Sequence, residues 1–150
     1  VALRLLADAP PLIAAMERFG PAYMEAIGRR WCWRLGVESR DPQSNAAVVA
    51  ASEKALSASG ISPDAFFFTH RGGRGAEGDL AAALEGYTPL GQDHPYWSDD
   101  APQSMLIDEV EAIWDAIAEH DDWDPLRAKV AALRRMGDAH GKAPIAAAQS

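Results

Sequence analysis

Residues 21–36 read PAYMEAIGRRWCWRLG, a stretch with the spacing of one amphipathic helix. Along one side, apolar side chains recur every four residues, at Tyr23, Ile27, Trp31 and Leu35. Pro21 suits a first helical turn, where the missing amide has no partner to lose. Gly36 can adopt the left-handed conformation that ends a helix. We therefore predict a helix over 21–36 whose apolar stripe forms the core on which the neighbouring segments pack.

The segments on either side of this helix are also predicted to be helical. Residues 1–20 carry apolar residues at helical spacing and end at a break, Gly20-Pro21, so we expect a separate first helix. Asp41-Pro42 predicts the cap and start of an alanine-rich helix that ends at Gly60 and packs its small side chains on the central stripe. Ser62-Pro63 starts a further segment with three phenylalanines, which fits a short helix or a short strand equally well.

The second half of the chain alternates irregular and helical segments. Residues 71–78 predict a glycine-rich loop with Arg71 and Arg74 exposed, 79–84 a brief helix, and 86–102 an irregular surface connector. Apolar residues from Met105 to Ile117 predict a helix over 103–119. Its outer face is acidic, with Asp108, Glu109, Glu111 and Asp115. Asp124-Pro125 predicts the cap of a last helix that ends at Gly137 and forms a hairpin with the preceding one.

Length and composition indicate one helical domain. A chain of 150 residues, 48% hydrophobic and rich in alanine, is large enough for one compact core but short for two. We predict an all-α fold, a compact bundle of about six or seven helices arranged as helical hairpins. Within this single domain, 1–71 form a first helical group, 72–102 a Gly/Pro-rich connector, 103–137 a helical hairpin and 138–150 a flexible tail.

Charge and cysteine content restrict the class of protein. The formal net charge of −8 argues against a general nucleic-acid binder or a dock for anionic lipid. The single cysteine, Cys32, cannot form an internal disulfide, and polar residues and prolines interrupt the apolar N-terminus before a signal peptide or membrane span is reached. We expect a cytoplasmic protein with no membrane and no nucleic-acid partner.

One glycine pattern matches a nucleotide-binding fingerprint. Residues 73–78 read GRGAEG and fit G-x-G-x-x-G, with a possible strand at 66–69 before them. The helix that follows is barely two turns long, and no second β-branched strand comes after it. We therefore favour a flexible linker over a nucleotide site.

Other candidate residues also favour structural roles. The acids of the run His120-Asp-Asp-Trp-Asp124 lack the spacing of a calcium loop and are better explained as turn residues and caps. The four histidines lie in different segments, so zinc is not expected. Cys32, between two tryptophans, favours burial over catalysis, whereas Trp33 lies off the main stripe and could reach a partner. We predict no catalytic, cofactor-binding or metal-binding residue.

Several stretches together resemble a known family. Phe19-Gly-Pro-Ala-Tyr23, Arg34-Leu-Gly-Val37, Asp64-Ala-Phe-Phe-Phe68 and the run from Glu111 to Trp123 are similar, in the same order, to the C-terminal helical region of SelO (YdiU-type) proteins. The segment 72–101 has no counterpart in the resemblance. Members of that family have a kinase-like fold and transfer AMP from ATP to protein hydroxyls. The resemblance implies that ATP and magnesium bind in an upstream kinase-like part, and none of those ligand residues can be placed on this sequence.

Three functional hypotheses follow. The chain opens on Val1 rather than methionine, and we expect it to be a non-catalytic piece of a SelO-like adenylyltransferase whose partner is the upstream kinase-like domain of the same protein. The alternative is a free-standing acidic helical module that binds another protein through 108–115. A third hypothesis, an enzyme that cradles a nucleotide at 73–78, requires a strand at 66–69.

Overall fold

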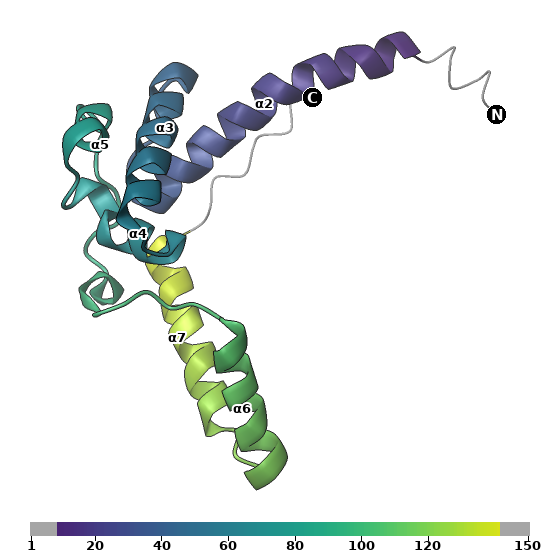
Figure 1. The fold of residues 1–150 in the computed structure, drawn as a ribbon, viewed down its shortest axis with the longest axis vertical. Coiled ribbons are helices and arrows are strands. Elements are labelled where there is room, and N and C mark those ends of the chain that lie inside the picture. Colours follow the sequence, from purple (N-terminus) through teal and green to yellow (C-terminus); the bar gives the residue numbers. More distant parts are fainter. Residues whose placement is uncertain (1–8, 142–150) are drawn as a thin grey trace.

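The computed structural model describes residues 9–141 and is all-α (Figure 1). The helices are α2 (Ala9–Leu35), α3 (Pro42–Ser59), α4 (Pro63–Thr69), α5 (Gly78–Ala83), α6 (Ile107–His120) and α7 (Asp124–His140), with 3-10 turns η1 (Arg71–Gly73) and η2 (Pro95–Ser98). These six α-helices confirm the predicted fold class. Extended backbone pairs at one isolated bridge, between Val37 and Pro89. The first eight residues of the helix predicted over 1–20, and residues 142–150 of the predicted flexible tail, lie outside the described residues.

α2 is one helix, so the predicted break at Gly20-Pro21 is wrong. Pro21 lies inside the helix, where it removes one amide hydrogen bond, to the carbonyl of Glu17. Glu17 is exposed, so water can solvate the carbonyl that Pro21 leaves free. The strong helix formers on both sides therefore continue through the proline.

The first half of α2 extends away from the other helices as an arm (Figure 1). Its apolar side chains are exposed, including Leu12 (61%), Ile13 (54%), Met16 (68%), Phe19 (66%), Tyr23 (53%) and Met24 (56%). The central stripe is therefore wrong in its first part, because Tyr23 faces solvent. Burial begins only near Ile27 and is complete at Cys32 and Leu35.

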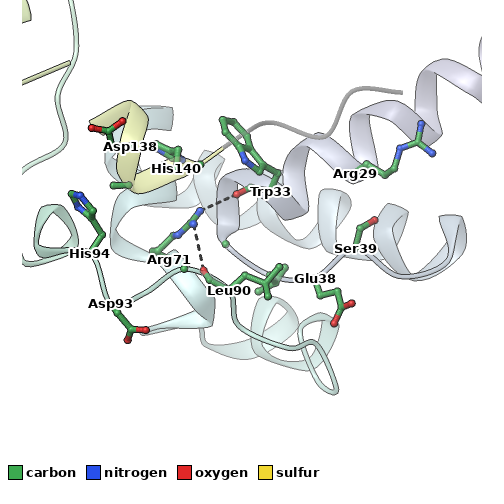
Figure 2. A pocket seen from close by; sticks show the side chains of 15 residues that line it. Arg29, Trp33, Glu38, Ser39, Arg71, Leu90, Asp93, His94, Asp138 and His140 are labelled. Carbon is green, nitrogen blue, oxygen red and sulfur yellow. Dashed lines mark hydrogen bonds between the residues drawn. The ribbon is translucent and has the colours of Figure 1, made fainter. Parts of the chain in front are cut away.

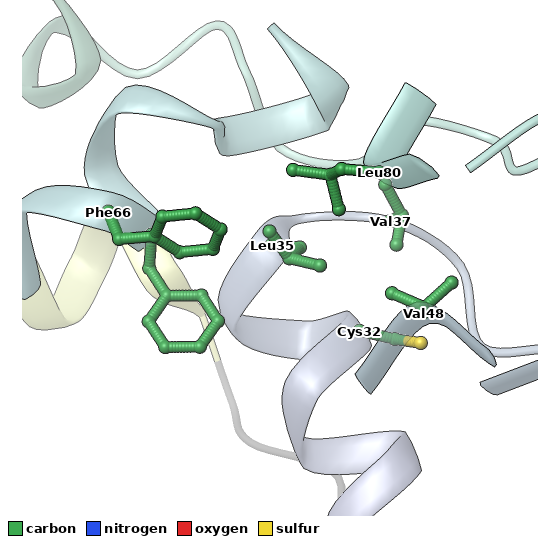
Figure 3. Close-up of a cluster of buried hydrophobic side chains, with 7 residues drawn as sticks. Cys32, Leu35, Val37, Val48, Phe66 and Leu80 are labelled. Atoms are coloured by element: carbon green, nitrogen blue, oxygen red, sulfur yellow. The ribbon is translucent and has the colours of Figure 1, made fainter. Parts of the chain in front are cut away.

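The main core forms where the second half of α2 meets α3, α4 and α5. Figure 3 shows its buried side chains, which are Cys32, Leu35, Val37, Val48, Phe66, Phe67 and Leu80. Trp31 packs on this cluster through an edge-on contact with Phe67, with ring centroids 5.2 Å apart. The three phenylalanines thus belong to helix α4, not to a strand, and two of them are buried because the helix turns them toward α2.

The contact between α2 and α3 confirms the predicted close packing. Gly28 of α2 meets Asn45 of α3, so this interface is built on a glycine rather than on the Tyr23 side of the stripe. Asp41 caps α3 by accepting from the Ser44 amide at 2.9 Å, and Gly60 ends the helix with φ 68°. Both signals were correctly read from the sequence.

The connector is not only surface structure, as the sequence had suggested. Its turn η2 carries Tyr96 and Trp97, which are 1% and 4% exposed. They pack against Ala139 of α7, with Phe68 and Met136 beside them, as a second small cluster. The burial of Tyr96 and Trp97 therefore depends on the C-terminal end of α7, which packs against the connector.

The hairpin of α6 and α7 is confirmed, but three of its details differ from expectation. α6 begins at Ile107, not at 103, and none of its residues is buried, so the apolar row from Met105 to Ile117 is not core. Asp124 does not cap α7 but is its first residue. Gly137 does not end α7, which continues to His140, because helical hydrogen bonds proceed through a glycine that nothing forces into a turn.

Candidate functional site

Two cavities share part of their walls at a pair of tilted rings, Trp33 of α2 and His140 of α7. The ring centroids of this pair are 5.1 Å apart, and both residues line both cavities. The first cavity, of about 570 Å³, opens between the ends of α2 and α7 and the connector (Figure 2). The second, of about 660 Å³, lies between α2, α4, η2 and α7. Both cavities bring polar groups and aromatic rings together.

Arg71 forms one wall of the first cavity and is buried, with 3% of its surface exposed. The prediction that it is exposed is therefore wrong, whereas Arg74 is exposed as expected. The Arg71 guanidinium donates from Nη1 to the Trp33 carbonyl at 2.9 Å and from Nη2 to the Leu90 carbonyl at 3.4 Å (Figure 2). Burial, with a smaller contribution from the charge of Arg74, lowers the pKa of Arg71 to about 10.

These contacts give Arg71 a structural task. Its Nη1 also donates to the Arg34 carbonyl at 3.3 Å, so one cation bonds two carbonyls at the C-terminal end of α2, of which that of Trp33 also accepts from the Gly36 amide at 3.1 Å. The plane of the guanidinium packs over the Trp97 ring, 4.3 Å from its centroid. Arg71 therefore ties the end of α2 to the connector, and the backbone carbonyls replace the carboxylate partner that a buried cation normally requires.

Gly36 permits this arrangement. A β-carbon on Gly36 would lie 2.2 Å from Nε of Arg71, and Gly36 has φ 67°, a conformation that favours glycine. The glycine predicted to end the central helix thus has two tasks, the turn and the space for a side chain thirty-five positions later. Only the first of these could be read from local sequence.

His140 is neutral in the folded protein. Burial lowers its pKa to about 4, with smaller contributions of the same sign from Arg71, Arg34 and Arg30, while Asp64 acts in the opposite direction. Its Nδ1 finds no hydrogen-bond partner among residues 9–141. The ring therefore serves as a packing surface between Trp33 and Trp97, not as a proton carrier at neutral pH.

The second cavity has aromatic walls and unpaired donors. Trp31, Trp33, Trp97 and His140 all line it, and the buried side-chain nitrogens of all four have no partner in the described part of the chain. Arg30 and Arg34 lie at the same cavity, and Arg34 is paired with Asp64 at 2.5 Å. The sequence analysis did not identify Trp97 as a wall of this site. The signal that could have found it is the Tyr96-Trp97 pair, because two large rings in an irregular connector favour burial.

The glycine fingerprint does not build a nucleotide site. The segment before it is helix α4, so the strand that this hypothesis required is absent, and the hypothesis is wrong. Gly73, Gly75 and Gly78 all have positive φ, as expected for successive tight turns. The helix that follows, α5, has six residues.

The acids of the turn between α6 and α7 are engaged locally. Asp121 accepts from the Trp123 indole at 2.9 Å, Asp122 accepts from the Asp124 amide at 3.0 Å, and Asp124 pairs with Arg127 at 2.9 Å. No group of three or more potential metal ligands gathers anywhere in the described chain. Asp121 and Asp122 are turn residues, as the sequence suggested, whereas Asp124 belongs to the first turn of α7 and does not cap it.

Cys32 and the remaining histidines also have structural neighbours. Cys32 is fully buried, donates to Asn45 Oδ1 at 3.3 Å, and burial raises its pKa to about 11, so it is a thiol and not a nucleophile. His94 accepts from the Tyr96 amide at 3.1 Å, and His70 contacts the Arg74 carbonyl at 2.9 Å. The structure does not bring these groups together.

The acidic face of α6 is mostly free. Asp108, Glu111 and Asp115 are exposed, and none has an ion-pair partner within residues 9–141. Glu109 differs, since its carboxylate lies 2.7 Å from the nearly buried ammonium of Lys129 on α7. One of the four predicted outer acids therefore helps to hold the hairpin together.

Comparison of the chain with models of protein families, with curated proteins and with solved structures gave no match. None of the helices between residues 9 and 141 combines the length and the apolar composition that crossing a bilayer requires.

Proposed function

We propose that this chain is a non-catalytic helical scaffold that docks on another protein domain through the exposed face of the α2 arm. The observation that carries the proposal is the position of Phe19 and Tyr23. Their rings stack with centroids 5.6 Å apart, and they are 66% and 53% exposed. Two adjacent aromatic rings left in water are costly for a folded protein and are typical of contact surfaces.

The rest of the arm extends this surface. Leu12, Ile13 and Met16 continue the same side of α2 toward its first residue, and each is more than half exposed. At about 25 cal/mol per Å², covering such a row on binding supplies several kcal/mol. A helix presenting residues at this spacing matches the helix-in-groove mode of recognition.

For the partner, we propose the kinase-like part of a SelO-like protein adenylyltransferase. The support is the sequence resemblance, because Phe19-Gly-Pro-Ala-Tyr23 is one of the stretches that carry it and lies on the exposed arm. This chain's own core does not use the two aromatic residues of that stretch. In this proposal ATP and magnesium belong to the partner, and the chain contributes support only.

The test is binding in trans to a SelO-like kinase domain from which its own C-terminal helical region has been removed. We expect a 1:1 complex by calorimetry and a loss of affinity of at least about tenfold for Phe19→Asp, because a charge would enter an apolar contact. Arg18→Asp is the matched control on the neighbouring side of the arm and should bind normally. A complex that is indifferent to Phe19→Asp, or no complex at all, would contradict the proposal.

The acidic module remains the second candidate. It is favoured by the three unpaired acids of α6, which lie beside the exposed Trp114. If α6 is the docking face, the triple change Asp108→Asn, Glu111→Gln and Asp115→Asn should abolish the complex and Phe19→Asp should not. The two sets of variants therefore distinguish the two functions in one assay.

A further inference from the structure

The second cavity has the size and the walls of a small-molecule site. Its volume of about 660 Å³ lies within the range of about 300–1,000 Å³ that ligand pockets occupy. Six aromatic side chains line it, namely Trp31, Trp33, Phe67, Phe68, Tyr96 and Trp97. Flat, apolar walls of this kind favour a flat, apolar ligand body.

Three of the tryptophans that line this cavity have indole N–H groups without an acceptor among the described residues. Trp97 is 4% exposed, and its indole N–H has no acceptor in the part of the chain that the structure describes. The indole N–H groups of Trp31 and Trp33, on α2, are buried and unpaired within residues 9–141 as well. Each of these nitrogens is shielded from solvent, so it faces packed protein and not the open space of the cavity, and a ligand there meets the carbon surfaces of the rings.

The charge at the cavity is also uncompensated. Arg34 is paired with Asp64, the one acidic residue in the lining. Arg30 also lines the cavity, with its guanidinium 4.2 Å from the Trp33 ring centroid, and no carboxylate lies within ion-pair distance of it among residues 9–141. Two arginines and one aspartate leave one positive charge here, in a chain whose net charge is −8.

We propose that this cavity binds a small aromatic carboxylate, with the ring against the aromatic walls and the carboxylate toward Arg30. A planar carboxylate can accept two parallel hydrogen bonds from a guanidinium, which is the geometry that arginine binds best. A cationic ligand is disfavoured, because the only carboxylate in the lining is engaged by Arg34. The site lies apart from the arm and does not depend on the docking function proposed above.

The experiment follows the five tryptophan indole signals in ¹H–¹⁵N spectra of the full chain, assigned by single Trp→Phe changes. The probe is 1-naphthoate, and its uncharged counterpart, 1-naphthamide, is the matched ligand control. We expect saturable shifts of the Trp31, Trp33 and Trp97 signals, with little change at Trp123, and affinity for the carboxylate at least about tenfold above that for the amide.

Variants connect the effect to the site. Arg30→Gln should remove the preference for the carboxylate while binding of the amide stays unchanged, and Arg18→Gln, on the arm, should leave both affinities as they are. Phe19→Asp should also bind 1-naphthoate normally, which separates this site from the docking face. Equal affinity for the two probes, shifts confined to Trp114 and Trp123, or a preference that survives Arg30→Gln would each overturn the proposal. Thermal unfolding of each variant shows whether the fold is retained.

Discussion

Gly28 of α2 lies so close to Asn45 of α3 that a β-carbon on residue 28 would come within 2.9 Å of the Asn45 Cβ. The two helices can approach this far only because residue 28 has no side chain. We expect Gly28→Ala to lower the free energy of unfolding by about 1–3 kcal/mol, despite the gain in helix propensity that alanine brings. Gly20→Ala is the matched control, since nothing lies within 4 Å of its added methyl group. It should not lower stability in urea unfolding, and equal effects of the two changes would contradict this account.

Asn45 itself holds three segments together. Its Oδ1 accepts from the Arg40 amide and the Tyr87 hydroxyl, each at 3.0 Å, and its Nδ2 donates to Ser39 Oγ at 2.9 Å. Asn45→Ala leaves these buried groups unpaired, so we expect a loss of about 2–4 kcal/mol. Gln43→Ala, exposed in the same helix, should change stability by less than about 0.5 kcal/mol. The comparison fails if the two variants unfold at the same urea concentration.

Arg71 should not be replaceable by lysine. A lysine keeps the charge but cannot donate in a fixed fork to the carbonyls of Trp33 and Leu90 while stacking on Trp97. We expect Arg71→Lys to cost about 2 kcal/mol or more, close to the cost of Arg71→Met. Full stability of the lysine variant would show that charge alone is needed at the end of α2.

The lowered pKa of His140 makes stability depend on pH. In the folded protein the pKa of His140 is about 4, below its usual value of 6.5. Between these two pH values the unfolded chain binds a proton at His140 and the folded chain does not. Stability is therefore fully present above pH 6.5 and decreases as the pH falls toward 4, by about 2–3 kcal/mol from this group.

His140→Phe tests the assignment, because it removes the titrating group and keeps a flat ring against Trp33. We expect the slope of unfolding free energy between pH 6.5 and 4 to become smaller in this variant. The side chains of Asp41, Asp79 and Asp99 have lowered pKa values and lose their stabilising effect at the acid end, below their usual range, in both proteins. A slope that is unchanged in His140→Phe would assign the pH dependence to other groups.

The helices were predictable because their signals are local. Asp41, Ser62 and Gly60 cap or end helices in the predicted way, since a cap depends on residues within one turn. Burial was less predictable, because it depends on which elements meet. The stripe from Tyr23 to Leu35 has one periodicity, yet Tyr23 has no neighbour to cover it and Leu35 does.

The cavity residues were the hardest to predict. Arg71 is held by carbonyls thirty-seven and thirty-eight positions earlier, and Trp97 packs on the C-terminal end of α7. Such pairings leave no pattern in a single sequence, because charge and aromatic residues at these positions are equally consistent with a solvated loop. The break predicted at Pro21 was wrong for a different reason. The local rule that proline ends a helix did not hold, because the helix formers on both sides continue the helix.

Because α6 has no buried residue, we expect it to unfold locally before the helices that form the core. α6 contacts α7, and the Lys129–Glu109 ion pair is one of the few links between them. Amide protons of α6 should therefore exchange with solvent deuterium well before those of α3, where Val48 and Ser52 are sealed in the core. In native hydrogen exchange, the protein should thus behave as a stable unit around the second half of α2 with a separately opening hairpin attached to it.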